Sequence, residues 1–148
     1  MNMALEDFFD FIARNKNIMT TSECKNHNIL TFAFVGDALF SLYVRTFVAN
    51  NSTAKSGVLH IKTTKYVKAS YQAKLIDLLN EYLNENEHHI VLTARNAKTN
   101  NIAKHSNLEE YKKSTSFEAL LGYLYLTHQM KRIDEILNIC KNEMEKDL

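Results

Sequence analysis

Apolar residues recur along this chain at the spacing of helices, in several separate blocks. Near the start, one block follows the i, i+3, i+4, i+7 spacing of an amphipathic helix, at Leu5, Phe8, Phe9 and Ile12. Near the end, a similar block contains Ile133, Ile136, Leu137 and Cys140. Each block predicts a helix with one face against a core.

Two longer blocks are apolar around most of the helical circumference. One runs from about residue 29 to 49, and the other from about 108 through STSFEALLGYLYLTHQ. Such helices lie at the centre of a fold or at a subunit interface. A further helix is predicted over about residues 60–83, with a core face made of Leu75, Leu78, Leu79 and Tyr82. The polar stretches NNSTAKSG and RNAKTNNIAKHSN are predicted loops, and HIVLTA is a short apolar piece between them.

Composition agrees with an all-helical chain. The 148 residues include no proline and only three glycines, with 45% apolar residues, whereas a sandwich or barrel needs many turn residues. We therefore expect one all-α domain over residues 1–148, a bundle of six or seven helices. The acidic start MNMALEDFFDFIARN does not resemble a secretory signal, and no uncharged apolar run reaches the ~18 residues of a membrane span. Two cysteines, Cys24 and Cys140, are too few for a disulfide framework, which favours a cytoplasmic protein.

The net charge is only +1, but the charges are segregated. Residues 51–74 contain five lysines and no acid, and residues 93–108 contain three bases and no acid. Segregated basic segments are typical of a surface that holds an anionic partner. A lysine-rich face that merely contacts solvent explains the same pattern.

Two isolated acids stand out within the apolar blocks. Asp37 interrupts FAFVGDALFSLYV, and Glu118 is the only charged residue between positions 114 and 127. A buried carboxylate without a partner is costly, so it shifts its pKa, finds a cationic side chain or binds a metal ion. If the two helices pack together, a cation between the acids resolves the repulsion. Mg²⁺ suits such a site, because it prefers oxygen ligands and keeps several waters. Asp37 and Glu118 are therefore the predicted metal ligands and catalytic residues.

Each acid also has an ordinary structural interpretation. Asp37 follows Gly36 and fits an N-cap of a helix that begins at Ala38. Thr115 and Glu118 match the T-x-x-E capping box. Spacing alone does not separate these interpretations from the metal site. The pair Cys24-x-x-His27 resembles half of a zinc site, but no second pair completes it.

Four stretches, taken in order, resemble the Mini-ribonuclease III family. They are FVGDALFSLYV, HIKTTKYVKASYQA, ARNAK and YKKSTSFEALLGYLYL, within about residues 29–128. This bacterial branch of ribonuclease III has the catalytic domain without a double-stranded-RNA-binding domain. The resemblance implies an all-helical homodimer that cleaves double-stranded RNA with Mg²⁺, in which Asp37 is the essential acid and Glu118 the second metal-binding carboxylate. It further implies a role in maturation of the large (23S) ribosomal RNA precursor in the cytoplasm, with no membrane and with a ribosomal protein as a candidate helper.

Full-length ribonuclease III enzymes carry two further acids where this chain has Ala33 and Thr115. Each position lies three or four residues before a retained acid, and therefore on the same helix face. The Mini branch shares this reduction. We expect a metal site with few protein ligands, completed by water and phosphate.

Duplex RNA presents mainly phosphates and 2′-hydroxyls, so we expect basic residues of the family-like segments to contact it. The candidates are Lys55, His60, Lys62, Lys65, Lys68, Arg95, Asn96, Lys98, Lys112 and Lys113. Two alternatives stay open. A catalytically silent RNA-binding or ribosome-associated scaffold would lack the two acids, and a purely structural dimerisation module would leave the acids and the segregated lysines unexplained.

Overall fold

The computed structural model describes residues 20–24, 27–97 and 107–148. These residues form seven α-helices, a short 3₁₀ helix and no strand, in the order α2 (Thr21–Cys24), α3 (Ile29–Asn50), α4 (Ser56–Val67), α5 (Ala69–Leu79), η1 (Asn80–Tyr82), α6 (Glu85–Arg95), α7 (Leu108–Leu126) and α8 (Met130–Glu145). The all-α fold is confirmed. The helix expected around Leu5–Ile12 lies outside the described residues.

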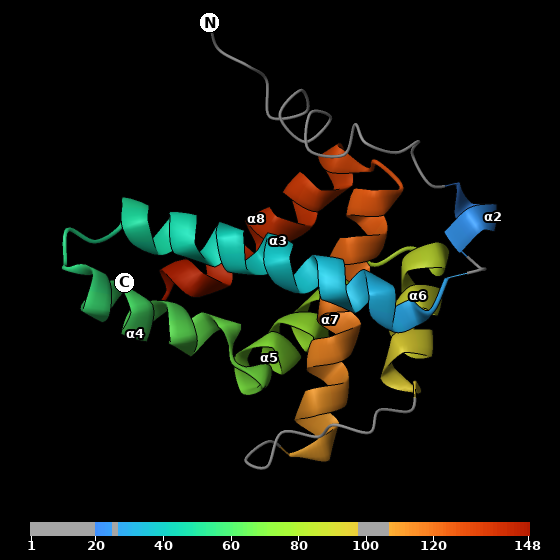
Figure 1. Cartoon of the computed structure of the whole chain (residues 1–148), viewed down its shortest axis with the longest axis horizontal. Coiled ribbons are helices and arrows are strands. Elements are labelled where there is room, and N and C mark those ends of the chain that lie inside the picture. The colour runs from blue at the N-terminus through green and yellow to red at the C-terminus, as the bar shows by residue number, and fades with distance from the viewer. Residues whose placement is uncertain (1–19, 25–26, 98–106) are drawn as a thin grey trace, which may run out of the picture.

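Helices α3 and α7 are the two apolar blocks of the sequence, and they cross near the middle of the molecule (Figure 1). Asn28 caps α3 by accepting a hydrogen bond from the Leu30 amide, and Asn107 caps α7 by accepting from the Glu109 amide. The other helices surround this crossing. Helices α5 and α6 flank α7, while α3 continues beyond it and pairs with α4 in a long hairpin (Figure 1).

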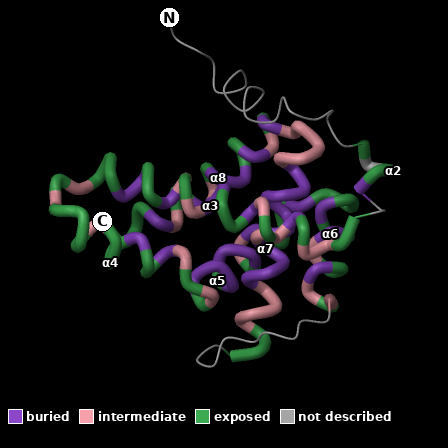
Figure 2. Tube along the Cα trace, in the orientation of Figure 1, coloured by how far each residue is buried: buried purple, intermediate pink, exposed green. Residues whose placement is uncertain are grey.

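The core follows the crossing, where buried segments of α3, α5 and α7 meet (Figure 2). Phe40 and Phe117 meet edge to face with ring centroids 4.8 Å apart, and both are fully buried. Helix α8 adds the apolar face that its sequence predicts, since Ile133, Ile136, Leu137 and Cys140 are all buried. The two apolar blocks are therefore the centre of the fold.

The single helix predicted over residues 60–83 is wrong in detail. The chain forms α4 from Ser56, breaks at Lys68, and continues as α5 and η1. Lys68 is extended (φ −67°, ψ 154°), so it ends one helix and begins the next without proline or glycine. The break lets α4 pack on α3 while α5 buries Leu75 and Leu79. Tyr82, a predicted core residue, is instead 50% exposed.

Helix α6 begins with a capping box that the sequence interpretation missed. The Asn84 side chain accepts from the Glu87 amide, and the Glu87 carboxylate accepts from the Asn84 amide. Glu87 is 1% exposed, and Arg132 of α8 donates to both of its oxygens at 2.8 and 2.9 Å. This buried ion pair attaches α8 to the start of α6.

Among the described helices, only α3 is long and apolar enough to cross a membrane by length and composition. Asp37 and Arg45 interrupt its apolar run, and 44% of its most apolar window is buried in the fold. A core helix passes the same test, so length and composition are weak grounds for a membrane span. The expectation that the chain spans no membrane stays a prediction.

Candidate active site

Two glycines bring α3 and α7 into backbone contact at their crossing. A Cβ added to Gly36 would overlap the carbonyl oxygen of Glu118 and lie 2.9 Å from the Gly122 nitrogen. A Cβ added to Gly122 would overlap the carbonyl oxygen of Phe32. The contact is thus reciprocal, with each glycine lying on the backbone of the other helix. Only residues without a side chain allow helices to approach this closely.

The crossing brings the two predicted acids together. Asp37 follows Gly36 on α3, and Glu118 precedes Gly122 by one turn on α7. Burial, then the charge of Asp37 and hydrogen-bonding contact with it, raise the pKa of the Glu118 carboxyl from 4.5 to about 8. The expectation that the acids converge in space is confirmed by this contact. The expected burial is only partly correct, because Asp37 is exposed in the chain while Glu118 is half-buried.

Neither acid is a helix cap. Asp37 lies within α3, which begins at Ile29, and Glu118 lies within α7, which begins at Leu108. The capping-box partner, Thr115, donates its hydroxyl to the Tyr111 carbonyl oxygen at 3.0 Å, one turn back in the same helix. Both ordinary interpretations of the sequence pattern are therefore excluded, and the facing carboxyls require another explanation.

The donor set at the crossing suits a hard divalent cation. Across residues 20–24, 27–97 and 107–148, no lysine or arginine forms an ion pair with Asp37 or Glu118. A cation between the two carboxyls would remove both the repulsion and the need for a proton on Glu118. Within the same ranges, no group of three or more His, Cys, Asp or Glu side chains is placed to hold a metal, so Cys24 and His27 gain no further ligands. Within those ranges, Asp37 and Glu118 are the carboxyl groups that meet at the crossing.

Ala33 and Thr115 occupy the two positions at which the resemblance implies further acids in full-length ribonuclease III enzymes. Ala33 lies one turn before Asp37 and packs against the core, and Thr115 lies one turn before Glu118 and is 8% exposed. Neither adds a carboxylate. The Thr115 hydroxyl already donates a hydrogen bond to the helix backbone. Few protein donors are left for any bound ion, and water must supply the others.

Half of the ten candidates for RNA contact lie on or beside α4. Lys62 and Lys65 are three residues apart and share a face of this helix, whereas His60 falls outside that face and Lys55 is the extended N-cap residue before the helix. All four are exposed, as is Lys68 at the break before α5. Lys62 donates to the Ser52 hydroxyl at 3.2 Å, and Lys65 pairs with Asp147 at 3.4 Å.

The other candidates cluster where α6 ends and α7 begins. Arg95 forms an ion pair with Glu109, and Asn96 is the exposed C-cap of α6. Lys112 and Lys113 are half-buried on α7, and Lys113 pairs with Asp77 of α5 at 2.9 Å. Lys98 lies outside the described residues. The structure does not test RNA contact for any of the ten candidates, but it shows that Lys65, Arg95 and Lys113 already have acidic partners.

Comparison with known proteins bears directly on this crossing. The family model described as Ribonuclease III domain matches residues 30–129, which include both acids and both glycines. The chain belongs to the ribonuclease III family. Its similarity extends to curated proteins named Mini-ribonuclease 3. The Clostridium tetani protein is 35% identical over 128 residues, covering 86% of this chain and 85% of the relative. The Enterococcus faecalis protein is 40% identical, covering 78% and 89%.

A solved structure shares the fold of this chain. The crystal structure of a Fusobacterium nucleatum protein matches with a TM-score of 0.74 and 27% identity, covering 82% of this chain and 97% of that one. The resemblance to the Mini branch of ribonuclease III is thus confirmed, and with it the activity class. The chain is a double-strand-specific endoribonuclease.

The sequence interpretation missed the residues that position the ribonuclease acids. Gly36 and Gly122 have no side chain that could bind a ligand, yet their backbone contact sets where Asp37 and Glu118 meet. A signal was present, because two of the chain's three glycines lie inside its most apolar helices, one and four residues from the acids. Glycine inside a helix costs about 1 kcal/mol relative to alanine, and that cost points to a packing need.

Proposed function

We propose that the chain hydrolyses phosphodiesters of double-stranded RNA at the Asp37–Glu118 pair, with Mg²⁺ as the resident ion. The observation that carries this proposal is the contact between two carboxyls that have no cationic side chain as partner among the described residues. A bound divalent ion would supply an activated water and stabilise the charge that develops at phosphorus.

The two carboxylates have different tasks because their surroundings differ. Asp37 is exposed, so an ion that it holds would also be open to a phosphate of the RNA. Glu118 is half-buried against the crossing and would hold the same ion once its proton is lost. Since the backbone contact of Gly36 and Gly122 fixes both helices, the pair is preorganised for one ion position.

The RNA duplex is expected to lie along α4 and past the crossing. Lys62 presents positive charge from an exposed face of α4, and the exposed Lys55, His60 and Lys68 add to it from the N-cap, the helix and its C-terminal end. Such a surface recognises the phosphate spacing of an A-form duplex rather than its base sequence. Arg95, Asn96, Lys98, Lys112 and Lys113 are proposed as a second contact group near the start of α7.

A homodimer would place two such sites on one duplex, one for each strand. The exposed face of α3 supports this proposal, because Phe34 is 80% exposed and Leu42 is 52% exposed on an otherwise central helix. We propose that the natural substrate is the large ribosomal RNA precursor, processed in the cytoplasm, with a ribosomal protein as a candidate helper. These assignments rest on the family resemblance.

The test is incubation of the purified protein with a perfectly paired RNA duplex, labelled on either strand, with Mg²⁺ or with a chelator. Metal-dependent cuts on both strands are expected. Calorimetric titration of Mg²⁺ into wild-type protein and an Asp37→Asn variant gives a second readout, with binding lost in the variant. RNA binding without cleavage in Mg²⁺ would favour the silent scaffold. The absence of both binding and cleavage would reject the RNA assignment.

A further inference from the structure

The acidic end of α8 is attached to lysines of α4 and α5. Asp147 pairs with Lys65 at 3.4 Å, and Glu143 pairs with Lys74 at 2.9 Å. We call these two ion pairs the C-terminal clasp. They join residues about seventy to eighty positions apart in sequence, so they reflect the fold rather than local helix pairing.

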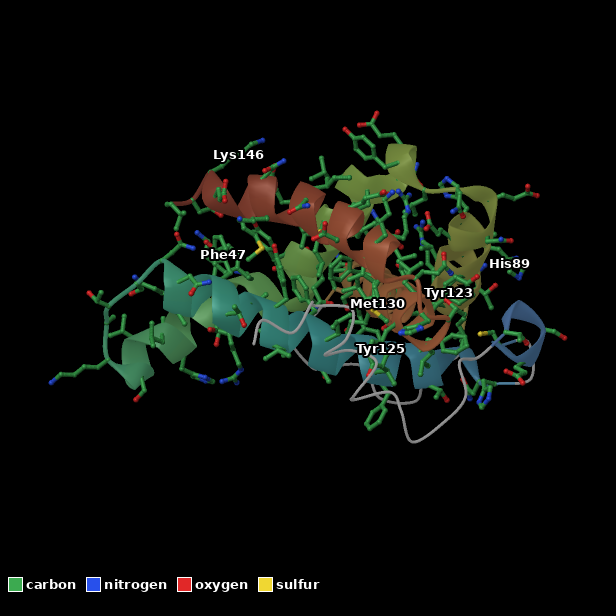
Figure 3. All side chains as sticks on the ribbon, turned by 90° about the horizontal axis from the view of Figure 1, so that it is seen from above. Phe47, His89, Tyr123, Tyr125, Met130 and Lys146 are labelled. Atoms are coloured by element: carbon green, nitrogen blue, oxygen red, sulfur yellow. The ribbon has the colours of Figure 1, made fainter. Side chains whose placement is uncertain are left out.

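Two tyrosine rings, those of Tyr66 and Tyr71, pack beside the clasp. The Tyr66 hydroxyl donates to the Met144 carbonyl oxygen at 3.5 Å, and the Tyr66 and Tyr71 rings meet edge to face at 5.1 Å. The Lys65 ammonium lies 5.5 Å from the Tyr66 ring centroid, and the Lys74 ammonium lies 5.3 Å from that of Tyr71. The chain end lies beside α4 in Figure 1, and Lys146 is labelled at this end of α8 in Figure 3.

The clasp divides the lysines of this surface into two groups. Lys55 and Lys62 form no ion pair with an acid of the described chain, whereas Lys65 and Lys74 do. Lys65 lies on the same α4 face as Lys62, and Lys55 is the N-cap residue of this helix. The positive surface of α4 therefore continues into α5, but Glu143 of α8 and Asp147, just after α8, pair with two of its lysines.

The clasp pairs are open to solvent on the lysine side. The Lys65 and Lys74 side chains are 49% and 55% exposed, while Glu143 also pairs with Lys146 at 2.9 Å. Solvent-exposed ion pairs contribute little to stability and weaken with salt. A duplex phosphate backbone attracts lysines more strongly, because each contact also releases condensed counterions.

We propose that Glu143 and Asp147 are internal competitors of RNA phosphate for Lys74 and Lys65, and that a bound duplex opens the clasp. This inference rests on the proposed RNA-binding role of α4. The acids then lower affinity for any short or weakly charged nucleic acid. Only a duplex long enough to reach from the α3–α7 crossing to α5 gains the two additional lysine contacts.

The experiment compares duplex RNA binding, in chelator to prevent cleavage, by wild type and a Glu143→Gln/Asp147→Asn variant over a salt series. We expect roughly three- to tenfold tighter binding at low salt, on the scale of removing two nearby like charges from a phosphate contact surface. Wild type already makes up to two of these lysine contacts when it binds. The slope of log affinity against log salt concentration should therefore differ between wild type and the variant by less than about two.

Two matched controls separate the clasp from general effects. Glu145→Gln removes one negative charge from the same helix end, but Glu145 pairs with Lys141 within α8 at 3.7 Å, so binding should change little. Lys65→Gln/Lys74→Gln also opens the clasp and loosens α8, but it frees no lysine. This variant should bind more weakly than wild type. Tightening by all three variants equally would overturn the competition.

A further variant distinguishes the clasp from the proposed RNA surface. Lys62→Gln should weaken duplex binding whether or not the clasp exists. If Lys62→Gln weakens binding while Glu143→Gln/Asp147→Asn binds as wild type does, the clasp proposal is wrong and the RNA surface stands. If Lys62→Gln and Lys65→Gln/Lys74→Gln both bind normally, the RNA surface on α4 is wrong, and the competition is wrong with it.

Discussion

Two glutamates of this chain, Glu87 and Glu118, face opposite electrostatic surroundings. Glu87 is almost fully buried, and burial by itself would raise its pKa, but hydrogen bonds from Arg132 and the Asn84 backbone outweigh burial and lower it. Glu118 is half-buried and faces a second acid, which together with burial raises its pKa to about 8. The Glu87 carboxylate is neutralised by Arg132 of the same chain. Among the described residues, no cationic side chain neutralises the pair of Asp37 and Glu118.

The difference separates a structural acid from a functional one. A buried carboxylate that holds the fold together is satisfied by the chain itself, as Glu87 is by Arg132 and Asn84. A carboxylate pair without a cationic partner is unfavourable in the free protein and becomes favourable only with a bound ligand. The contrast therefore makes predictions for each site, in stability and in activity.

The largest effect is expected for Asp37→Asn. Cleavage should fall by about a thousandfold or more, the scale expected when a group acting at the reacting atoms is removed. Thermal stability without metal should be equal or higher, because the change removes a charge that faces Glu118. Single-turnover cleavage and thermal unfolding measure the two effects. Near-normal turnover would remove Asp37 from the mechanism.

Gly122→Ala should damage the same site through the backbone. The added methyl overlaps the Phe32 carbonyl oxygen, which belongs to a helix backbone and cannot rotate away. We expect a loss of about 3 kcal/mol or more in the free energy of unfolding, the upper range for an overpacked core. Gly57→Ala is the matched control, since nothing lies within 4 Å of its added methyl. Equal stability of the two variants in denaturant titrations would contradict the close crossing.

Glu87→Gln tests the other half of the comparison. The amide cannot compensate the Arg132 charge, so we expect unfolding to become easier by about 2–3 kcal/mol, below the usual cost of a broken buried pair because Arg132 is partly exposed and also contacts Glu135. Metal affinity and cleavage by the folded protein should hardly change. A loss of metal binding at constant stability would show that this glutamate is not purely structural.

Stability in chelator should also depend on pH. Because the folded pKa of Glu118 is raised from 4.5 to about 8, the folded state holds its proton more tightly than the unfolded state. Stability should therefore fall as pH rises from about 4.5 to 8, and this slope should be absent in Glu118→Gln. Added Mg²⁺ should remove the loss near pH 8, where the ion replaces the proton. Parallel melting curves for the two proteins across that range would contradict the shift.

The sequence was sufficient for the two apolar helices and their acids, because apolar periodicity is local and a lone charge within it is conspicuous. It was insufficient for the break at Lys68, where tertiary packing of α4 on α3 and α5 on α7 decides and no helix breaker marks the position. The meeting of Asp37 with Glu118 could be proposed from charge alone. Its cause, the contact of Gly36 and Gly122, depends on the register of two distant helices.

The surface ion pairs also could not be predicted from the sequence. The basic segments suggested a surface that holds an anionic partner, but Lys65, Arg95 and Lys113 form ion pairs with Asp147, Glu109 and Asp77. Two of these acids come from segments far along the chain, so composition within a segment could not reveal them. The number of lysines available to a nucleic acid is a property of the folded chain.

Because bare main chain separates α3 from α7, the distance between the backbones that carry Asp37 and Glu118 is set by direct contact of two peptide chains. Rotamer changes and substitutions elsewhere in the interior cannot widen or narrow it by small steps. We expect the ion-holding geometry to be all or none, retained unaltered up to the temperature at which the helices part and then lost in the same transition as the fold.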